Sequence, residues 1–373
     1  MIGRNLSLYL DFWRVVAALT VFVSHLAYPR FTQGDYILIR DLNLGSDAVV
    51  LFFVISGFVI AYVSDKPDLS GRRFAFDRLT RLYSVAAPAV VFTLLADAIG
   101  VWVAPDAYSG WWHHAAPLWQ SLTLGLSFSS EWFGSSFRLG SNGPFWSLSY
   151  EAGYYLLFGI LVFAKGAWRW GAIVVAVALG PNILLLAPSW IFGVLAYRVS
   201  RRSAQNSVGI WLMLILPIMA YPVLLFYQAP YLLGLATLVV FGWDFTASLG
   251  FSDEFVWNGL VGALFAMHLI AVARLCSGLG ELSEVVSQPH LRVLNLRWWA
   301  GASFSIYLVH YPALQLLIAL FPSLRESWAG HVMFGAAGLA ICLVFAACFE
   351  RRLPQVRAFM LSLLPSRSNQ PLS

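Results

Sequence analysis

The sequence predicts an all-α membrane protein that crosses the bilayer many times. Of its 373 residues, 60% are hydrophobic and only 11% are charged, and long apolar segments recur along the chain. An apolar run of about 20 residues spans the hydrocarbon core as a helix, so we expect about ten transmembrane helices together with short or re-entrant segments. Aromatic residues make up 16% of the chain, which is typical of proteins with interfacial aromatic belts.

The apolar segments set the predicted order of crossings. They lie at 8–27, 47–64, 84–103, 145–164, 170–186, 188–199, 208–227, 231–242, 255–275, 301–320 and 330–349. Segments 188–199 and 231–242 are short and are flanked by Pro or Gly, so whether each one crosses the membrane stays open.

Basic residues between the apolar segments predict the orientation. A basic loop follows the second segment and contains Arg72, Arg73, Arg78 and Arg81. Because short cytoplasmic loops are enriched in Lys and Arg, we place this loop and both termini in the cytoplasm. We expect one transmembrane domain over residues 1–350 and a cytoplasmic tail over 351–373, whose Ser/Pro-rich end at 365–373 is loose.

The remaining composition excludes several function classes. The net charge of +5 does not indicate nucleic acid binding, because the basic residues lie in short loops between apolar segments. Cys276, Cys342 and Cys348 are far apart or lie within apolar segments, so they indicate neither a disulfide framework nor a metal site. The sequence contains no Gly-x-Ser-x-Gly elbow and no HExxH zinc motif, so a soluble-type esterase or metalloprotease is disfavoured. We expect no metal cofactor.

A polar stripe runs along the first apolar segment. Arg14 and His25 are eleven helical steps apart, so they lie on nearly the same face, about 16 Å apart along the axis. Asp11 lies one turn before Arg14. Ionisable side chains at membrane depth are costly and usually mark function. The alternative is an Asp11–Arg14 pair that only holds helices together.

The largest predicted non-cytoplasmic loop spans 104–144 and is rich in tryptophan. It contains Trp111, Trp112, Trp119 and Trp132, with Glu131 and Arg138 among them. Aromatic faces beside hydrogen-bonding side chains could bind a sugar. The alternative is an interfacial loop whose tryptophans lie at the lipid headgroups.

Glu151 opens the apolar segment that follows this loop. His25 lies near the outer end of the first segment, so the two side chains are predicted at one level in the outer half of the membrane. A carboxylate beside an imidazole orients the ring and raises its basicity. We therefore expect His25 and Glu151 to act together.

Several motifs in order resemble the acyltransferase family 3 membrane proteins. An arginine, ten residues and a histidine on the first helix match Arg14 and His25. The resemblance covers nearly the whole chain. Its other motifs are the Ser-Gly-Phe segment at 50–60, Arg78 with Arg81, the stretch Trp146-Ser147-Leu148-Ser149-Tyr150-Glu151, the stretch 303–312 and, more loosely, Glu350 with Pro354.

The resemblance implies an acyltransferase of the bacterial inner (cytoplasmic) membrane. It moves an acyl group, usually acetyl, from cytoplasmic acyl-CoA to a hydroxyl of an envelope glycan or lipid-linked sugar. His25 then serves as general base, in direct transfer or through an acyl-histidine; the sequence leaves both open.

The basic residues suit such a donor. Arginine matches phosphate oxygens well, so Arg78 and Arg81 are expected to bind the phosphates of acetyl-CoA, and Arg14 a charged part of the donor within the membrane. The alternative for the basic loop is membrane topology alone.

Two further sets of side chains are expected to line the site. Trp146 and Ser147 directly precede Glu151, and Tyr307 and His310 share one helical face. Ser303 lies one turn before Tyr307. The alternative for these residues is hydrogen bonding between helices.

Two other function classes compete with the acyltransferase. Arg, His and Glu at membrane depth, with Pro- or Gly-flanked short segments, are also typical of a broken-helix transporter. A scaffold of a polysaccharide export complex is the third class, but it would gain little from a buried histidine.

Overall fold

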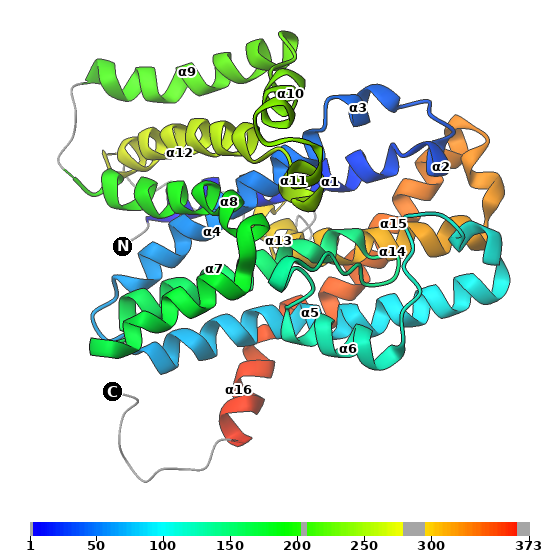
Figure 1. The fold of residues 1–373 in the computed structure, drawn as a ribbon, viewed down its shortest axis with the longest axis horizontal. Helices are drawn as coiled ribbons and strands as arrows, with labels where there is room; N and C mark the ends of the chain where they lie inside the picture. Colours follow the sequence, from blue (N-terminus) through cyan, green and yellow to red (C-terminus); the bar gives the residue numbers. More distant parts are fainter. Residues whose placement is uncertain (1–2, 203–206, 279–294, 364–373) are drawn as a thin grey trace. The chain divides into compact units, whose positions relative to one another are not determined.

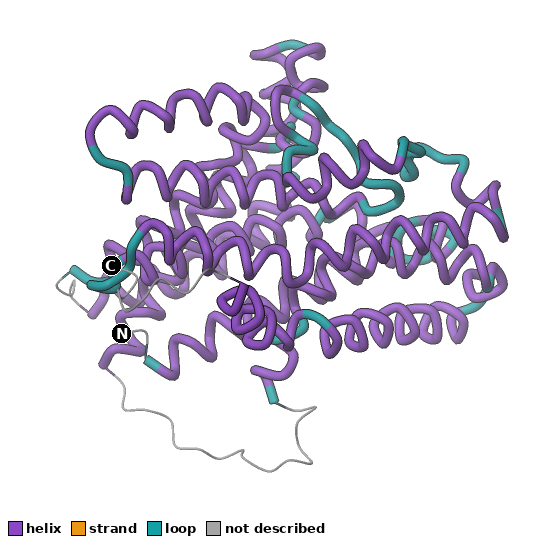
Figure 2. Tube along the Cα trace, turned by 90° about the horizontal axis from the view of Figure 1, so that it is seen from below, coloured by secondary structure: helices purple, strands orange, loops and turns teal. Residues whose placement is uncertain are grey.

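The computed structural model describes residues 3–202, 207–278 and 295–363. Within these ranges the chain forms α-helices and short 3-10 turns and contains no β-strand (Figure 2). Eight of the described helices are long and apolar enough to cross a membrane. The helix α7 (Trp146–Phe163) and the shorter apolar helix α10 (Ala229–Phe241) are not among these eight. The predicted all-α polytopic membrane protein is confirmed. The tail segment 365–373 lies outside the described residues.

The chain divides into two compact units that interleave in sequence. The first unit comprises Met1–Ala17, Ser46–Leu69 and Ile173–Ala300, and the second comprises Ala18–Gly45, Ser70–Ala172 and Gly301–Ser373. Helix α1 (Arg4–Leu26) contributes its first part to one unit and its last part, with His25, to the other.

The first unit is a set of packed apolar helices. It contains most of α4 (Leu44–Ser64) and α8 (Gly171–Ser200), and α9 (Ser207–Phe226) packs along α12 (Phe255–Gly278) in Figure 1. The remaining elements are α10, α11 (Trp243–Ser248), η5 (Gly250–Ser252) and α13 (Leu296–Ala300).

The Ser-Gly-Phe motif has a packing role in this unit. A Cβ atom on Gly57 would lie 2.1 Å from the Trp190 carbonyl oxygen, and one on Gly193 would lie 2.0 Å from the Val54 carbonyl oxygen. Only glycine lets the backbones of α4 and α8 approach so closely. The Trp190 indole also donates to the Ser56 hydroxyl at 3.3 Å.

The prediction that 170–186 and 188–199 are two separate apolar segments is corrected by the structure of α8. The two segments form one helical element that is broken at Gly180, where φ is 76° and ψ is 174°. The break falls there because glycine alone adopts this backbone conformation readily, and Pro181 follows it. Pro188 lies inside the continuing helix, so 188–199 is not a separate element.

The predicted basic loop is also corrected, because it is helical. Helix α5 runs from Gly71 to Val103 and so includes all four arginines at its beginning. The side chain of Ser70 caps it by accepting from the Arg73 backbone N–H at 3.3 Å. The helix extends past the apolar segment because arginine favours helix and keeps its charged end in water.

Helix α14 (Ser303–Leu320) lies at the centre of the second unit. It packs against α5 and α15 (Trp328–Cys348), and almost all of its residues are buried. Figure 1 shows these helices running side by side. The remaining elements of this unit are α2 (Pro29–Thr32), α3 (Ile37–Asp41), η1 (Pro105–Tyr108), α6 (Leu118–Ser127), η2 (Trp132–Gly134), η3 (Gly143–Phe145), α7, η4 (Gly166–Trp170), η7 (Pro322–Arg325), η8 (Glu350–Arg352) and α16 (Leu353–Leu363).

Candidate active site

Two histidines from distant parts of the sequence form a hydrogen-bonded pair. His25 Nδ1 lies 2.9 Å from His310 Nε2, and His310 Nδ1 lies 2.8 Å from the Ile306 carbonyl oxygen. A carbonyl oxygen can only accept, so His310 Nδ1 carries the proton and neutral His310 accepts at Nε2. His25 Nδ1 therefore donates, which leaves the lone pair of neutral His25 on Nε2.

The surroundings of His25 are aromatic and positively charged. Its ring stacks on Tyr28, with ring centroids 5.7 Å apart, and meets the edge of Tyr311 at 5.0 Å. The guanidinium carbon of Arg30 lies 4.6 Å from the Tyr28 ring centroid, and that of Arg40 lies 4.1 Å from it. His310 is fully buried, whereas His25 keeps part of its surface accessible.

Arg30 joins the histidine pair to α14 and to the tryptophan-rich loop. It donates to the Tyr311 hydroxyl and, at 3.3 Å, to Gln315 Oε1. Its guanidinium carbon also lies 4.9 Å from the Trp112 ring centroid. Burial lowers the pKa of Arg30, and the Tyr311 hydroxyl opposes that shift.

Glu151 does not reach His25. No hydrogen bond joins the two side chains in the described ranges, and Glu151 instead accepts from the Tyr155 hydroxyl one turn further along α7. The imidazole of His25 instead has its hydrogen bond with His310 of α14. Glu151 lies within electrostatic range of Tyr307.

The residues around Glu151 do contact α14. Tyr307 donates its hydroxyl to Ser147 Oγ at 2.7 Å, and Ser147 is buried. Ser147 Oγ in turn donates to the Pro144 carbonyl oxygen at 3.2 Å. Trp146 lies against Tyr150 with ring centroids 4.8 Å apart. The structure therefore brings Ser147, Tyr307 and His310 together, while buried Ser303 lies at the start of α14.

The loop at 104–144 is fixed to α5 and α14 by buried polar groups. The Asp97 carboxylate accepts from the Ser141 hydroxyl at 2.5 Å and from the Ser141 backbone N–H at 2.7 Å. The Asn142 amide donates to Thr93 Oγ1 and to the Leu308 carbonyl oxygen, both at 2.9 Å. These bonds hold the loop against the part of α14 that carries His310.

The four tryptophans of this loop have different surroundings. Trp112 contacts Arg30, and the Arg138 guanidinium carbon lies 5.4 Å from the Trp111 ring centroid. The Trp132 indole donates to the Ser149 carbonyl oxygen at 3.4 Å. Trp119 is 69% exposed. Trp112 is therefore placed beside Arg30, which contacts the Tyr28 and Tyr311 rings that surround His25.

Glu131 is a buried carboxyl group of the same loop. It is only 2% exposed, and this burial raises its pKa to about 8, while the positive charge of Arg138 opposes the shift. Burial therefore favours the neutral, protonated form of this carboxyl group.

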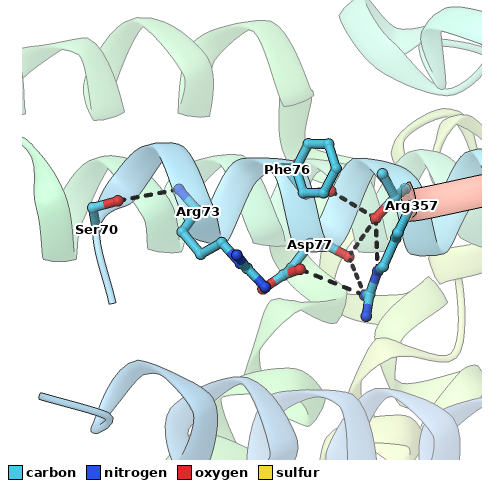
Figure 3. Close-up of polar contacts among 6 residues, drawn as sticks. Ser70, Arg73, Phe76, Asp77 and Arg357 are labelled. Carbon is cyan, nitrogen blue, oxygen red and sulfur yellow. Dashed lines mark hydrogen bonds and ion pairs between the residues drawn. The ribbon is translucent and has the colours of Figure 1, made fainter. Parts of the chain in front are cut away.

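The arginines at the start of α5 are largely paired. Arg73 Nε lies 3.2 Å from Asp77 Oδ2. Arg357 of α16 donates to the Asp77 carbonyl oxygen at 3.1 Å and to Thr80 Oγ1 at 3.2 Å, and lies 3.8 Å from Asp77 Oδ1 (Figure 3). Arg72 is exposed. This network attaches α16 to the beginning of α5.

Arg81 and Arg78 differ in their partners. Arg81 lies 3.4 Å from the buried Glu350 carboxylate, which also accepts from the Ser305 backbone N–H at 2.8 Å. Arg78 keeps a buried Nε–H that makes no hydrogen bond within the described residues.

Arg14 pairs with Asp11 at 3.5 Å, which is the contact considered above as a packing alternative. Both residues belong to the first unit, and they precede His25 on the continuous helix α1.

Sequence reasoning missed Arg30, Arg40, Tyr28 and Tyr311. A signal for two of them was present, because Tyr28 and Arg30 follow His25 within two helical turns. The contact of both with α14 depends on how the chain turns back after α1, which no local pattern encodes.

Comparison with known proteins gives one family and two partial relatives. A family model described as an acyltransferase domain matches residues 7–348. The acyltransferase MdmB of Streptomyces mycarofaciens is 32% identical over 149 residues, which is 39% of this chain and 36% of that protein. The O-acetyl transferase of Shigella phage Sf6 is 27% identical over 154 residues, which is 41% of this chain and 45% of that protein. The matches thus span less than half of either relative, and no solved structure matches.

Proposed function

The chain belongs to the acyltransferase domain family, and on that basis we propose that it transfers an acyl group from cytoplasmic acyl-CoA to a hydroxyl of an envelope glycan or lipid-linked sugar. Acetyl is the proposed group, which the name of the phage relative supports. The bacterial cytoplasmic membrane is the proposed location, because the donor is made in the cytoplasm and the helices suit a bilayer.

One observation carries this proposal: the contacts of α14 connect the arginines of α5 to His25 over a short path. Ser305 binds Glu350, which pairs with Arg81, and His310 binds His25. His310 lies five helical steps after Ser305, so the two contacts are only about 7.5 Å apart along the helix axis. The flexible thiol arm of CoA is long enough for that step.

The histidine pair supplies the base. The lone pair on His25 Nε2 accepts the proton of the acceptor hydroxyl while its oxygen attacks the thioester carbonyl carbon. The carbon–sulfur bond then breaks, and the imidazolium returns its proton to the leaving thiolate, which gives free CoA and the ester. His310 fixes the tautomer that places the lone pair on Nε2.

We propose that the acyl donor and the acceptor bind different residues around this centre. Arg78, with its unused buried Nε–H, and Arg81 bind donor phosphates. Trp112 offers an aromatic face to the acceptor beside Arg30. Glu151 acts through the Tyr307–Ser147 contact rather than on the imidazole.

The test uses purified protein in lipid nanodiscs with labelled acetyl-CoA and envelope glycan. We expect labelled ester in the glycan, and a loss of at least 100-fold in turnover for His25→Ala. The matched control is His268→Ala in the first unit, a histidine bound to the Leu214 carbonyl oxygen and Tyr9. Near wild-type turnover of His25→Ala at saturating donor would refute the proposal.

The same protein distinguishes the two chemical routes. Incubation with labelled acetyl-CoA but without acceptor, followed by rapid quenching, leaves the protein unlabelled if transfer is direct. Label on His25 would instead identify an acyl-histidine intermediate.

A further inference from the structure

Two arginines beside His25 have no acidic partner. Arg30 donates to the Tyr311 hydroxyl and to the Gln315 amide oxygen, and Arg40 donates to the Ser24 hydroxyl at 2.9 Å and to the Ser24 carbonyl oxygen at 3.5 Å. Within the ranges that the structure describes, no carboxylate forms an ion pair with either guanidinium. Each guanidinium has five N–H donors, so several remain for a ligand.

The position of these charges ties them to the reacting centre. Both guanidinium carbons lie against one ring, that of Tyr28, which stacks on His25. Arg30, Arg40 and Arg138 all lie within electrostatic range of the His25 imidazole. A ligand group held between Arg30 and Arg40 would therefore lie next to the base.

Keeping such charges half-buried is costly. Desolvation disfavours a charged group that lacks a counterion, and it lowers the pKa of Arg30 here. Packing on aromatic rings recovers part of this cost but does not neutralise the charge. An anion that enters with the substrate would neutralise it, and guanidinium groups bind carboxylate and phosphate oxygens in pairs.

We propose that the acceptor sugar carries a negatively charged group, a carboxylate or a phosphate, which binds between Arg30 and Arg40 and holds the hydroxyl at His25. This inference rests on the proposed function, since it assigns the substrate class of the same site. The donor phosphates are not the expected occupant, because Arg81 connects to α14 at Ser305, ten residues and about 15 Å before Gln315.

The test compares charged and neutral acceptors that are otherwise matched. One pair is a glucuronate-containing oligosaccharide and its carboxyl-reduced form. The other is a neutral saccharide on polyprenyl phosphate and the same saccharide freed of phosphate. We expect the charged member of at least one pair to be used better, and the pair identifies carboxylate or phosphate as the source.

Variants then assign the preference to the two arginines. Arg30→Gln and Arg40→Gln should raise the KM of the charged acceptor by about 10- to 100-fold and leave that of its neutral counterpart and of acetyl-CoA unchanged. Arg40→Lys should restore part of the preference, because charge returns without the paired donors. The matched control is Arg325→Gln, which removes one charge at an exposed position.

Three results would overturn the inference. They are no preference for charge in either pair, an equal loss of kcat on all acceptors, which would assign the arginines to the transition state, and a raised KM for acetyl-CoA. Direct binding of the glucuronate oligosaccharide without donor separates this inference from the proposed function. Binding that Arg40→Gln weakens supports the anion site even where no ester forms, and His25→Ala should bind normally.

Discussion

Two regions along α14 hold their arginines in different ways. We call the region around the start of α5 and Glu350 the Arg81 end, and the region around Tyr28 and Tyr311 the His25 end. At the Arg81 end, Asp77 pairs with Arg73 and Arg357, and Glu350 pairs with Arg81. At the His25 end, Arg30 and Arg40 contact hydroxyl, amide and carbonyl oxygens and aromatic rings.

Under the proposals above, this difference separates arginines that hold helices together from arginines that bind a ligand. An ion pair inside the protein satisfies the guanidinium and attaches one helix to another, as Arg357 attaches α16 to α5. A guanidinium without a carboxylate keeps its charge for an incoming anion. By this criterion Arg78, whose Nε–H makes no hydrogen bond within the described residues, is the arginine at the Arg81 end that we propose binds acyl-CoA.

The strongest test of this comparison removes the carboxylate at the Arg81 end. Glu350→Ala leaves Arg81 and the Ser305 backbone N–H without their partner, so we expect a loss of about 3–5 kcal/mol of stability. Thermal unfolding in detergent measures it, with Glu326→Ala at an exposed position as the control. Unchanged stability together with a raised KM for acetyl-CoA would instead place Glu350 in the donor site.

The second test removes the hydrogen-bond partner of the His25 imidazole, the proposed base. His310→Gln should lower kcat by about 100-fold and change its pH profile, with little effect on the KM of acetyl-CoA, because the His25 tautomer is no longer fixed. The control is His331→Gln, a buried histidine that binds the Arg325 carbonyl oxygen and Tyr36. A pH profile identical to that of the wild type would show that His310 only packs.

The third test compares two arginines of α5 directly. Arg78→Ala should raise the KM of acetyl-CoA by about tenfold, and Arg78→Lys by less, because a single charge-assisted hydrogen bond to phosphate is lost or weakened. Arg73→Ala should leave it unchanged, since Asp77 already neutralises that charge. Equal donor affinity in all three variants would remove Arg78 from the site.

The last test concerns Glu131, the buried carboxyl group of the tryptophan-rich loop, whose expected effect on stability accumulates gradually with pH. Its pKa of about 8 in the folded protein exceeds the usual value of a glutamate, so the unfolded chain ionises first as pH rises. Stability should therefore fall between about pH 4.5 and pH 8, by at most about 1.4 kcal/mol per pH unit, and level off above that range. Thermal unfolding of Glu131→Gln should show a weaker decline; an identical pH dependence would contradict the assignment.

Much of the architecture could be predicted from the sequence. Long apolar runs determine helices in a membrane whatever their neighbours, because every backbone group must be satisfied within the segment. Spacing along one helix likewise placed Tyr307 and His310 on a shared face. The boundary of α5 was missed because arginine favours helix beyond the apolar run, and Gly180 was missed as the break in α8.

The sequence by itself determined which chemistry-bearing residues exist and which helices carry them; only the tertiary structure decided their partners. His25 was expected beside Glu151 at the same depth, yet depth does not say which helix is the neighbour, and α14 brought His310 there instead. Arg30 and Arg40 acquired their place beside Tyr28 in the same way. Helix formation follows local spacing along the chain, whereas a hydrogen bond between residues 285 positions apart depends on how whole helices pack.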